Sequence, residues 1–375
     1  MSQSSNRFVD HAVAGVQRLT AYPPGKPISE LERELGIQNI AKLASNENPL
    51  GPSPAAIQAI KDSASEVWLY PDGGGFALKQ ALSAKHGVAI DQITLGNGSS
   101  DMLEFVVRVF VNPGDEVLFS QHSFAIYPLV TQAVGAIGVA APAKNWGYDL
   151  DALQARISDK TRVIFIANPN NPTGTWLTGD ELDAFMMQVP SDVIVVMDEA
   201  YFDYAIDLAG ADGYVDTIPW IEHYPNLVVT RTFSKSYGLA GLRVGYSVSH
   251  PDVADLLNRI RPPFNVNLPA LAAAEAALTD EAHLQKSVAL NRAGLKQLQQ
   301  GFDAMGLSYI PSVGNFISVD VGQEAAPLYQ ALLYEGVIVR PVGNYEMPNH
   351  LRISVGLPEQ NERFLNGLKN VLKIA

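Results

Sequence analysis

Polar and charged side chains that could do chemistry follow a series of short apolar runs in the middle of the chain. The loop 96–101 comes after the short run Ile93-Thr-Leu95 and opens onto a helix-like segment, whose free N–H groups and dipole would attract an anion. Three later runs are followed by the remaining candidates: Asn171, then Asp198 and Tyr201, then Lys235 with Arg243 eight residues further on. Such a set can hold a phosphate, an aromatic cation, a phenolate and a carbonyl that reacts with an amine.

Each of these features also has an ordinary structural explanation. Asp198 could only cap a helix, the run Asn168-Pro-Asn-Asn-Pro-Thr-Gly174 could be turn chemistry, and a Ser-Lys pair in a loop is usually solvated surface. Their recurrence after successive strands favours a site, because ligands gather outside the carboxyl ends of strands in open α/β sheets.

The elements that must position these residues alternate between strands and amphipathic helices, which is typical of a parallel sheet covered by helices. The predicted strands are 93–95, 116–119, 162–167, 193–197, 226–230 and 244–248, with helices such as 101–110 and 179–188 between them. After residue 265 the pattern becomes α+β, with helices at 269–278 and beyond and short strands at 316–319, 336–340 and 350–355. We therefore predict an α/β fold: an N-terminal arm (1–45), a large domain with a mostly parallel sheet (46–265) and a smaller α+β domain (266–375).

The composition of the chain excludes several classes of protein and of partner. The 375 residues suggest two or three domains, and 47% hydrophobic against 17% charged residues predicts a sizeable core. A net charge of −13 disfavours nucleic acid and anionic membranes as partners. The chain has no cysteine, which excludes disulfides and thiolate chemistry, and its first residues do not read as a signal peptide, so we expect a soluble cytoplasmic protein.

Competing catalytic motifs fail on inspection. Gly96-x-Gly98 has Asp101 where a dinucleotide-binding fingerprint needs a third glycine, and no Gly-Lys-Ser/Thr phosphate loop is present. The seven histidines include no i,i+4 pair, so no metal site is predicted.

Several longer motifs resemble a known family. The blocks Asn168-Pro-Asn-Asn-Pro-Thr-Gly174, Asp198-Glu-Ala-Tyr201 and Thr232-Phe-Ser-Lys-x-x-Gly-Leu-Ala-Gly-Leu-Arg-Val-Gly-Tyr246 resemble fold-type I pyridoxal-phosphate aminotransferases. Further motifs are similar to those of histidinol-phosphate aminotransferases: Tyr22-Pro-Pro-Gly-Lys-Pro27, Lys42-Leu-Ala-Ser-Asn-Glu-Asn-Pro-Leu-Gly51, Tyr70-Pro-Asp72 and Leu351-Arg-Ile-Ser-Val-Gly356. The resemblance extends from about residue 16 to the C-terminus.

The resemblance implies pyridoxal 5′-phosphate as cofactor and a role for each matching residue. Lys235 would bind the cofactor covalently and later move the proton between Cα and C4′. Asp198 would keep the pyridine nitrogen protonated, while Tyr201 and Asn171 would hydrogen-bond the ring oxygen. The ring and phosphate would be held by Phe124, Ser99, Ser100, Ser234 and Arg243.

The resemblance also implies the substrate contacts and a homodimer. Arg352 would take the substrate carboxylate, Arg340 is the candidate for the distal anion, and Tyr22 would contact substrate. Tyr70 would reach the phosphate of the neighbouring subunit, so the two sites would be shared.

Two departures from the family pattern bear on the substrate. Position 124 is Phe where Tyr is frequent, which keeps ring stacking but loses a hydroxyl, and Ser-Tyr follows Lys235 where Ala-Phe is common. Transfer of an amino group between histidinol phosphate and 2-oxoglutarate is the leading interpretation. An aromatic-amino-acid aminotransferase is the first alternative, and a related decarboxylase or a non-enzymatic regulator with the same fold comes after it.

Overall fold

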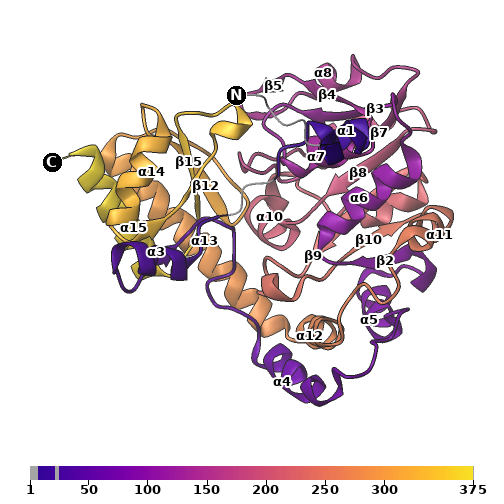
Figure 1. Ribbon diagram of the computed structural model, residues 1–375, viewed down its shortest axis with the longest axis horizontal. Helices are drawn as coiled ribbons and strands as arrows, with labels where there is room; N and C mark the ends of the chain where they lie inside the picture. Colours follow the sequence, from indigo (N-terminus) through magenta and orange to yellow (C-terminus); the bar gives the residue numbers. More distant parts are fainter. Residues whose placement is uncertain (1–6, 22–24, 375) are drawn as a thin grey trace.

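The computed structural model describes residues 7–21 and 25–374, and its larger part is built on a seven-stranded sheet with the order β2-β10-β9-β8-β7-β3-β4 (Figure 1). The strands are β2 (Ile93–Gly96), β3 (Glu116–Ser120), β4 (Ile137–Ala141), β7 (Thr161–Ala167), β8 (Ile194–Asp198), β9 (Leu227–Thr232) and β10 (Gly245–Ser249). The run from β9 to β4 is parallel, whereas β10 is antiparallel to both β9 and β2. The carboxyl ends of β2, β3, β7, β8 and β9 therefore meet at one edge.

The predicted fold class is confirmed, and the six predicted strands all form with ends shifted by a few residues. Sequence reasoning missed β4, the edge strand that follows α7. Its sequence Ile-Gly-Val-Ala-Ala is mostly exposed or half-buried, so it lacks the continuous apolar run of the buried strands.

Helices cover this sheet and extend beyond it. Those of the larger part are α4 (Pro54–Ser63), α5 (Phe76–His86), α6 (Ser99–Phe110), α7 (Ile126–Ala133), α8 (Leu150–Gln154), α9 (Gly179–Met186), α10 (Phe202–Ala209), α11 (Pro251–Ile260) and α12 (Leu268–Thr279). α6 packs across β2, β10, β9, β8 and β7, while α12 packs on α4 and α5. α9 begins at a capping box in which Thr178 and Glu181 satisfy each other's backbone N–H groups.

The smaller part has a four-stranded antiparallel sheet with the order β11-β12-β15-β14. Its strands are β11 (Tyr309–Ile310), β12 (Phe316–Asp320), β14 (Arg340–Pro341) and β15 (His350–Ser354), and its helices are α13 (Glu281–Met305), α14 (Ala325–Tyr334) and α15 (Pro358–Leu372). The strand predicted at 336–340 is split into β13 (Val337–Ile338) and β14, because β13 pairs instead with β1 (Ala41–Lys42).

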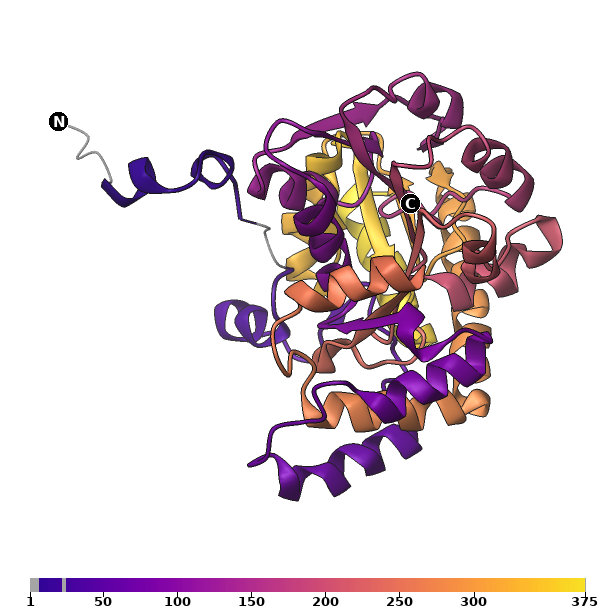
Figure 2. The same ribbon diagram turned by 90° about the vertical axis from the view of Figure 1, so that its right-hand side faces the viewer.

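The remaining α-helices and strands are short. They are α1 (Arg7–His11), α2 (Ala14–Gln17), α3 (Ile28–Leu35), and the hairpin of β5 (Ala143–Lys144) and β6 (Gly147–Tyr148). Figure 2 shows α1 and α2 at one edge of the molecule, and α2 lies against α7.

The division into 1–45, 46–265 and 266–375 stays a prediction. Two separate hydrophobic cores do exist, one under the large sheet and one under the small sheet. However, α12 packs into the first core, and α13 contributes Leu284 and Val288 to the first core and Leu295 and Leu298 to the second.

Candidate active site

A cavity of about 290 Å³ lies where the carboxyl ends of the large sheet face β14 and β15. Eleven of the thirteen predicted site residues line it: Ser99, Ser100, Phe124, Asn171, Asp198, Tyr201, Ser234, Lys235, Arg243, Arg340 and Arg352. The structure thus brings together residues that are up to 253 positions apart, as Ser99 and Arg352 are. Their individual roles remain predictions.

Lys235 stands in the loop after β9, and its amine is buried. Its Nζ donates a hydrogen bond to the backbone oxygen of Ser45 at 3.3 Å. Burial, with Arg352 and Arg243 nearby, lowers the pKa of Lys235 to about 8, although Glu47 acts in the opposite direction. About a fifth of this amine is therefore neutral near physiological pH, far more than for an ordinary lysine, and the neutral form is the one that acts as nucleophile or proton acceptor.

Asp198 ends β8 as a buried carboxylate held by hydroxyl groups. Tyr127 Oη donates to its Oδ2 at 2.9 Å, and Thr230 Oγ1 donates to its Oδ1 at 3.2 Å. Burial raises the pKa of Asp198, and these two hydrogen bonds act against that rise. Within the described part of the chain, Asp198 forms no ion pair.

Tyr201 receives two amide donors at its hydroxyl oxygen. Asn46 Nδ2 donates to Tyr201 Oη at 2.8 Å and Asn171 Nδ2 does so at 3.2 Å. The Asn171 amide is fixed in turn, because its Oδ1 accepts from Arg352 Nη1 at 2.5 Å. Burial raises the pKa of Tyr201 to about 12, so its own proton is retained and can be donated to a further oxygen.

The start of α6 and the loop before β10 form an anion site. Arg243 Nη1 donates to Ser234 Oγ at 3.2 Å, and its Nη2 donates to the Asn97 carbonyl at 3.2 Å. Gly98 has a φ of +82°, and a Cβ there would lie 2.6 Å from Arg243 Nη2. Glycine is therefore required for the guanidinium to approach the N-terminus of α6, where Ser99 and Ser100 stand.

Arg352 lies in the middle of β15 with its guanidinium buried at the cavity. Its Nη2 donates to the Ala44 carbonyl at 2.8 Å, and its Nε has no partner among the described residues. Arg340, on β14, is the Cα partner of Arg352 across the sheet and also lines the cavity. Two guanidinium groups from adjacent strands thus serve one cavity.

Two predicted residues are not brought to this cavity. Tyr22 lies outside the described residues. Tyr70 does not line the cavity: it is 82% exposed and stacks on Phe264 with 4.7 Å between ring centroids.

Sequence reasoning missed Asn46, Thr230 and Tyr127, which contact the predicted residues directly. Asn46 was visible within the quoted motif 42–51, but its contact with Tyr201 is made over a separation of 155 residues. Tyr127, three positions after Phe124, lies on a helix and carried no strand-end signal.

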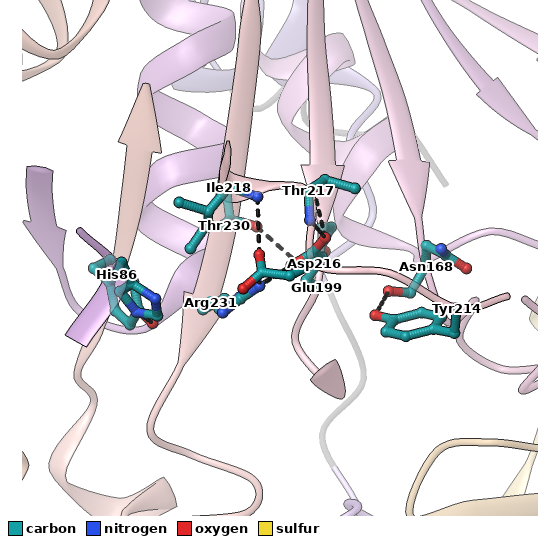
Figure 3. A network of polar contacts seen from close by, with 11 residues as sticks. His86, Asn168, Glu199, Tyr214, Asp216, Thr217, Ile218, Thr230 and Arg231 are labelled. Carbon is teal, nitrogen blue, oxygen red and sulfur yellow. Dashed lines mark hydrogen bonds and ion pairs between the residues drawn. The ribbon is translucent and has the colours of Figure 1, made fainter. Parts of the chain in front are cut away.

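An ion network is formed by Glu199, which follows β8, with Arg231 of β9 and Asp216 (Figure 3). Arg231 donates to Glu199 Oε2 through Nε at 3.0 Å and through Nη2 at 2.6 Å, and Nη2 also contacts Asp216 Oδ1 at 2.6 Å. Thr217 Oγ1 donates to Glu199 Oε1 at 2.5 Å, and the guanidinium lies 3.5 Å from the ring centroid of Phe202. Glu199 is therefore neutralised within the protein.

Comparison with known proteins assigns this chain to a defined family. The family described as aminotransferase class I and II matches residues 38–368, so the chain belongs to that family. Within it, the chain is 60% identical over 98% of its length to histidinol-phosphate aminotransferase 2 of Pseudomonas fluorescens, covering 99% of that protein. It is 57% identical to histidinol-phosphate aminotransferase 1 of Nitrosococcus oceani, with 98% of each chain covered.

Solved structures agree with this assignment. The crystal structure of histidinol-phosphate aminotransferase from Sinorhizobium meliloti in complex with pyridoxal-5′-phosphate superposes with a TM-score of 0.88, at 29% identity, covering 96% of this chain and 97% of that one. Aspartate aminotransferase from Thermus thermophilus shares the fold, with a TM-score of 0.83 at 19% identity and coverage of 96% and 99%.

No helix within 7–21 and 25–374 is long and apolar enough to cross a membrane. The same residues contain no cluster of three or more His, Asp or Glu that could hold a metal ion. The predicted cytoplasmic location stays a prediction.

Proposed function

We propose that this chain is a pyridoxal-phosphate-dependent transaminase that moves the amino group of histidinol phosphate to 2-oxoglutarate. One observation of the structure carries the proposal. The charged groups Asp198, Lys235, Arg243 and Arg352 line one cavity, and their hydrogen bonds within the described chain run only to neutral groups. Buried charges are normally compensated, so a ligand with complementary charges fits this cavity.

The cofactor fits the donors that are present. Asp198 offers a buried, unpaired carboxylate for a protonated ring nitrogen, and Tyr201 with Asn171 offers donors for a ring oxygen. Arg243 and the start of α6 suit a phosphate, and Phe124 lines the same cavity and suits the ring face. When bound, pyridoxal phosphate supplies an aldehyde for amines and a ring that withdraws electrons from the substrate Cα.

The chain's own residues then bind the substrate and move one proton. Lys235, with a pKa of about 8, would take the proton from the substrate Cα and return it to C4′ of the cofactor. Asp198 would hold the protonated ring nitrogen, and Tyr201 would hydrogen-bond the ring oxygen. The buried cavity keeps these charges in a low dielectric, where they act strongly.

Both substrates are anionic, and the arginines of the small sheet can select them. With a net charge of −13, the protein as a whole repels a phosphate or a dicarboxylate, so affinity must come from local guanidinium groups. Arg352 suits a carboxylate, and Arg340 suits the distal anion, which is the phosphate of histidinol phosphate or the side-chain carboxylate of glutamate. The identity of 60% to a protein of that name, over 98% of the chain, supports histidinol phosphate as the donor.

A coupled assay tests the proposed substrate. Histidinol phosphate and phenylalanine are each supplied with 2-oxoglutarate, and kcat/KM is compared. We expect a clear preference for histidinol phosphate. A higher kcat/KM for phenylalanine would favour the aromatic-amino-acid alternative, and no turnover of either would overturn the assignment.

We also propose that the active unit is a homodimer with shared sites. Val67, Trp68, Leu69 and Tyr70 are exposed in one loop, next to exposed Phe264. A contiguous apolar surface of this kind is typical of a protein interface. Tyr70 does not reach the cavity of its own chain, which fits a role in the cavity of the partner.

Hybrid dimers test the shared site. An inactive Lys235→Ala protein is mixed with an inactive Tyr70 variant under conditions where subunit exchange is demonstrated. Some activity should return, because one site in each hybrid then contains both intact residues. No recovery would contradict a shared site.

A further inference from the structure

Tyr127 contacts both Phe124 and Asp198, two residues of the proposed cofactor site, although the mechanism above gives it no role. It is completely buried on α7, and its ring is stacked on Phe165 with 4.5 Å between centroids and 5° between planes. Its ring also makes an edge-to-face contact with Phe124, with 5.9 Å between ring centroids and 89° between planes. Its hydroxyl donates to Asp198 Oδ2 at 2.9 Å. Tyr127 therefore touches both the residue suited to the ring face and the residue suited to the ring nitrogen.

The surroundings of Asp198 show why this hydroxyl matters. The groups facing the carboxylate are the Tyr127 and Thr230 hydroxyls, the backbone N–H of Ala200 and, at longer range, the Lys235 amine. Each favours the ionised carboxylate, whereas burial favours the protonated form. Tyr148 and Tyr201 complete the titratable surroundings of Tyr127, and burial raises the pKa of Tyr127 well above its usual value. Tyr127 therefore remains a donor over the whole working range of pH.

A ring nitrogen facing Asp198 would share one proton with the carboxylate. The proton lies on the stronger base, and every hydrogen bond donated to a carboxylate makes that carboxylate a weaker base. With fewer donors, the buried carboxylate would take the proton and leave the ring nitrogen neutral. A neutral ring withdraws less electron density from the substrate Cα.

We propose that Tyr127 is a positioning residue that keeps the shared proton on the cofactor ring nitrogen by holding Asp198 ionised and fixed. This inference rests on the proposed function, because it assumes that the ring nitrogen lies against Asp198. Thr230 assists from the other carboxylate oxygen, but Tyr127 makes the shorter hydrogen bond and is clamped between two aromatic rings.

Two conservative variants separate this role from packing. Tyr127→Phe keeps the ring and removes only the hydroxyl. Tyr148→Phe is the matched control, since Tyr148 is also buried, and its hydroxyl accepts from the Ala167 N–H at 3.0 Å and donates to the Phe165 carbonyl at 3.4 Å without touching Asp198. Both variants lose one buried hydroxyl, so a general loss of packing would affect them alike.

The measurement is nitrogen-15 NMR of holoenzyme reconstituted with ring-labelled pyridoxal phosphate. In the wild type and in Tyr148→Phe, the ring nitrogen should resonate as a protonated pyridinium. In Tyr127→Phe, we expect the resonance to move toward the neutral pyridine position. Exchange of the substrate Cα proton in D₂O should slow about tenfold, the scale of one hydrogen bond to a charged group.

The outcomes distinguish the inference from the function on which it rests. An unchanged pyridinium resonance in Tyr127→Phe would overturn the role of Tyr127 and leave Asp198 in its proposed place. An equal shift in both variants would show that the effect is general packing and would also overturn it. A neutral pyridine resonance already in the wild type would show that the ring nitrogen carries no proton for Tyr127 to keep there, and it would overturn the role of Tyr127 whether or not Asp198 faces the ring.

Discussion

In the ion network beside β8 and β9, charged side chains are paired with each other, whereas those of the adjacent cavity are not. Arg231 contacts both Glu199 and Asp216, and the Glu199 carboxylate is completely buried. In the cavity, Asp198 contacts hydroxyl groups and Lys235 contacts a carbonyl. Within the described residues, the cavity's charges thus lack the internal compensation that the network has.

The contrast is sharpest between two consecutive residues. Asp198 and Glu199 are both buried, and burial raises the pKa of both. Neighbouring residues at the end of a strand point to opposite faces, so Glu199 meets Arg231 and Asp198 meets the cavity. Arg231 offsets the cost of burying Glu199, whereas the cost of burying Asp198 is left for a ligand to offset. The pattern of unpaired buried charge therefore marks the functional face of the sheet.

The largest expected effect comes from removing the unpaired carboxylate. Asp198→Asn should lower kcat by about 100-fold or more, because an amide cannot stabilise a positive ring nitrogen. Asp216→Asn makes the same chemical change in the network and should leave turnover close to wild type. Steady-state kinetics of both variants decides the matter. Near wild-type turnover in Asp198→Asn would reduce Asp198 to a structural residue.

The next effect concerns the unpaired guanidinium of Arg352. Arg352→Ala should lower kcat/KM for glutamate by roughly 30-fold or more, since losing a buried charge-assisted contact costs about 2–5 kcal/mol. The measurement is the reverse reaction at limiting glutamate. A loss below about threefold would mean that Arg352 only braces Asn171 and Ala44.

A pH effect follows from the buried amine of Lys235. Its pKa is lowered to about 8, so the reactive neutral form increases as the pH rises through this value. Capture of pyridoxal phosphate by cofactor-free enzyme should accelerate roughly tenfold between about pH 7 and about pH 9. Stopped-flow absorbance measures this rate. In Arg352→Ala, the pH dependence of this rate should move to higher pH, because a nearby positive charge is gone. A wild-type rate that rises only above about pH 10 would contradict a lowered pKa of Lys235.

The smallest effect is expected at Arg340. Arg340→Ala should weaken kcat/KM for histidinol phosphate by roughly fivefold, on the scale of a partly exposed ion pair. Phenylalanine has no distal anion and should be affected less. Equal losses of kcat/KM for the two donors would show that Arg340 does not bind the distal anion, and would favour an aromatic amino acid as the substrate.

Much of the fold and site could be predicted from the sequence because both follow local rules. Buried strands such as β7 and β8 read as continuous apolar runs; Asp198 comes directly after one, and Asn171 and Lys235 follow within a few residues of the ends of β7 and β9. The exposed edge strand β4 carries no such run and was missed.

The supporting residues could not be predicted for a different reason. Tyr127 contacts Asp198 across 71 positions, and Asn46 contacts Tyr201 across 155. The sequence around Tyr127 and Asn46 does not indicate these contacts, because they depend on how helices and the N-terminal segment pack against the sheet. The pairing of Glu199 with Arg231 likewise depends on the register of β8 and β9, which the sequence pattern does not specify.

Thermal unfolding of the cofactor-free protein tests most directly whether the two buried carboxylates differ as described. Asp198→Asn should leave Tm unchanged or raise it, because it removes an unpaired buried charge, but it should reduce the increase in Tm on adding pyridoxal phosphate. Glu199→Gln should lower the free energy of unfolding by about 3–5 kcal/mol, because it leaves Arg231 without its buried partner. If Asp198→Asn destabilised the cofactor-free protein as much as Glu199→Gln does, the charge of Asp198 would already be compensated within the protein, and the distinction between the cavity and the network would fail.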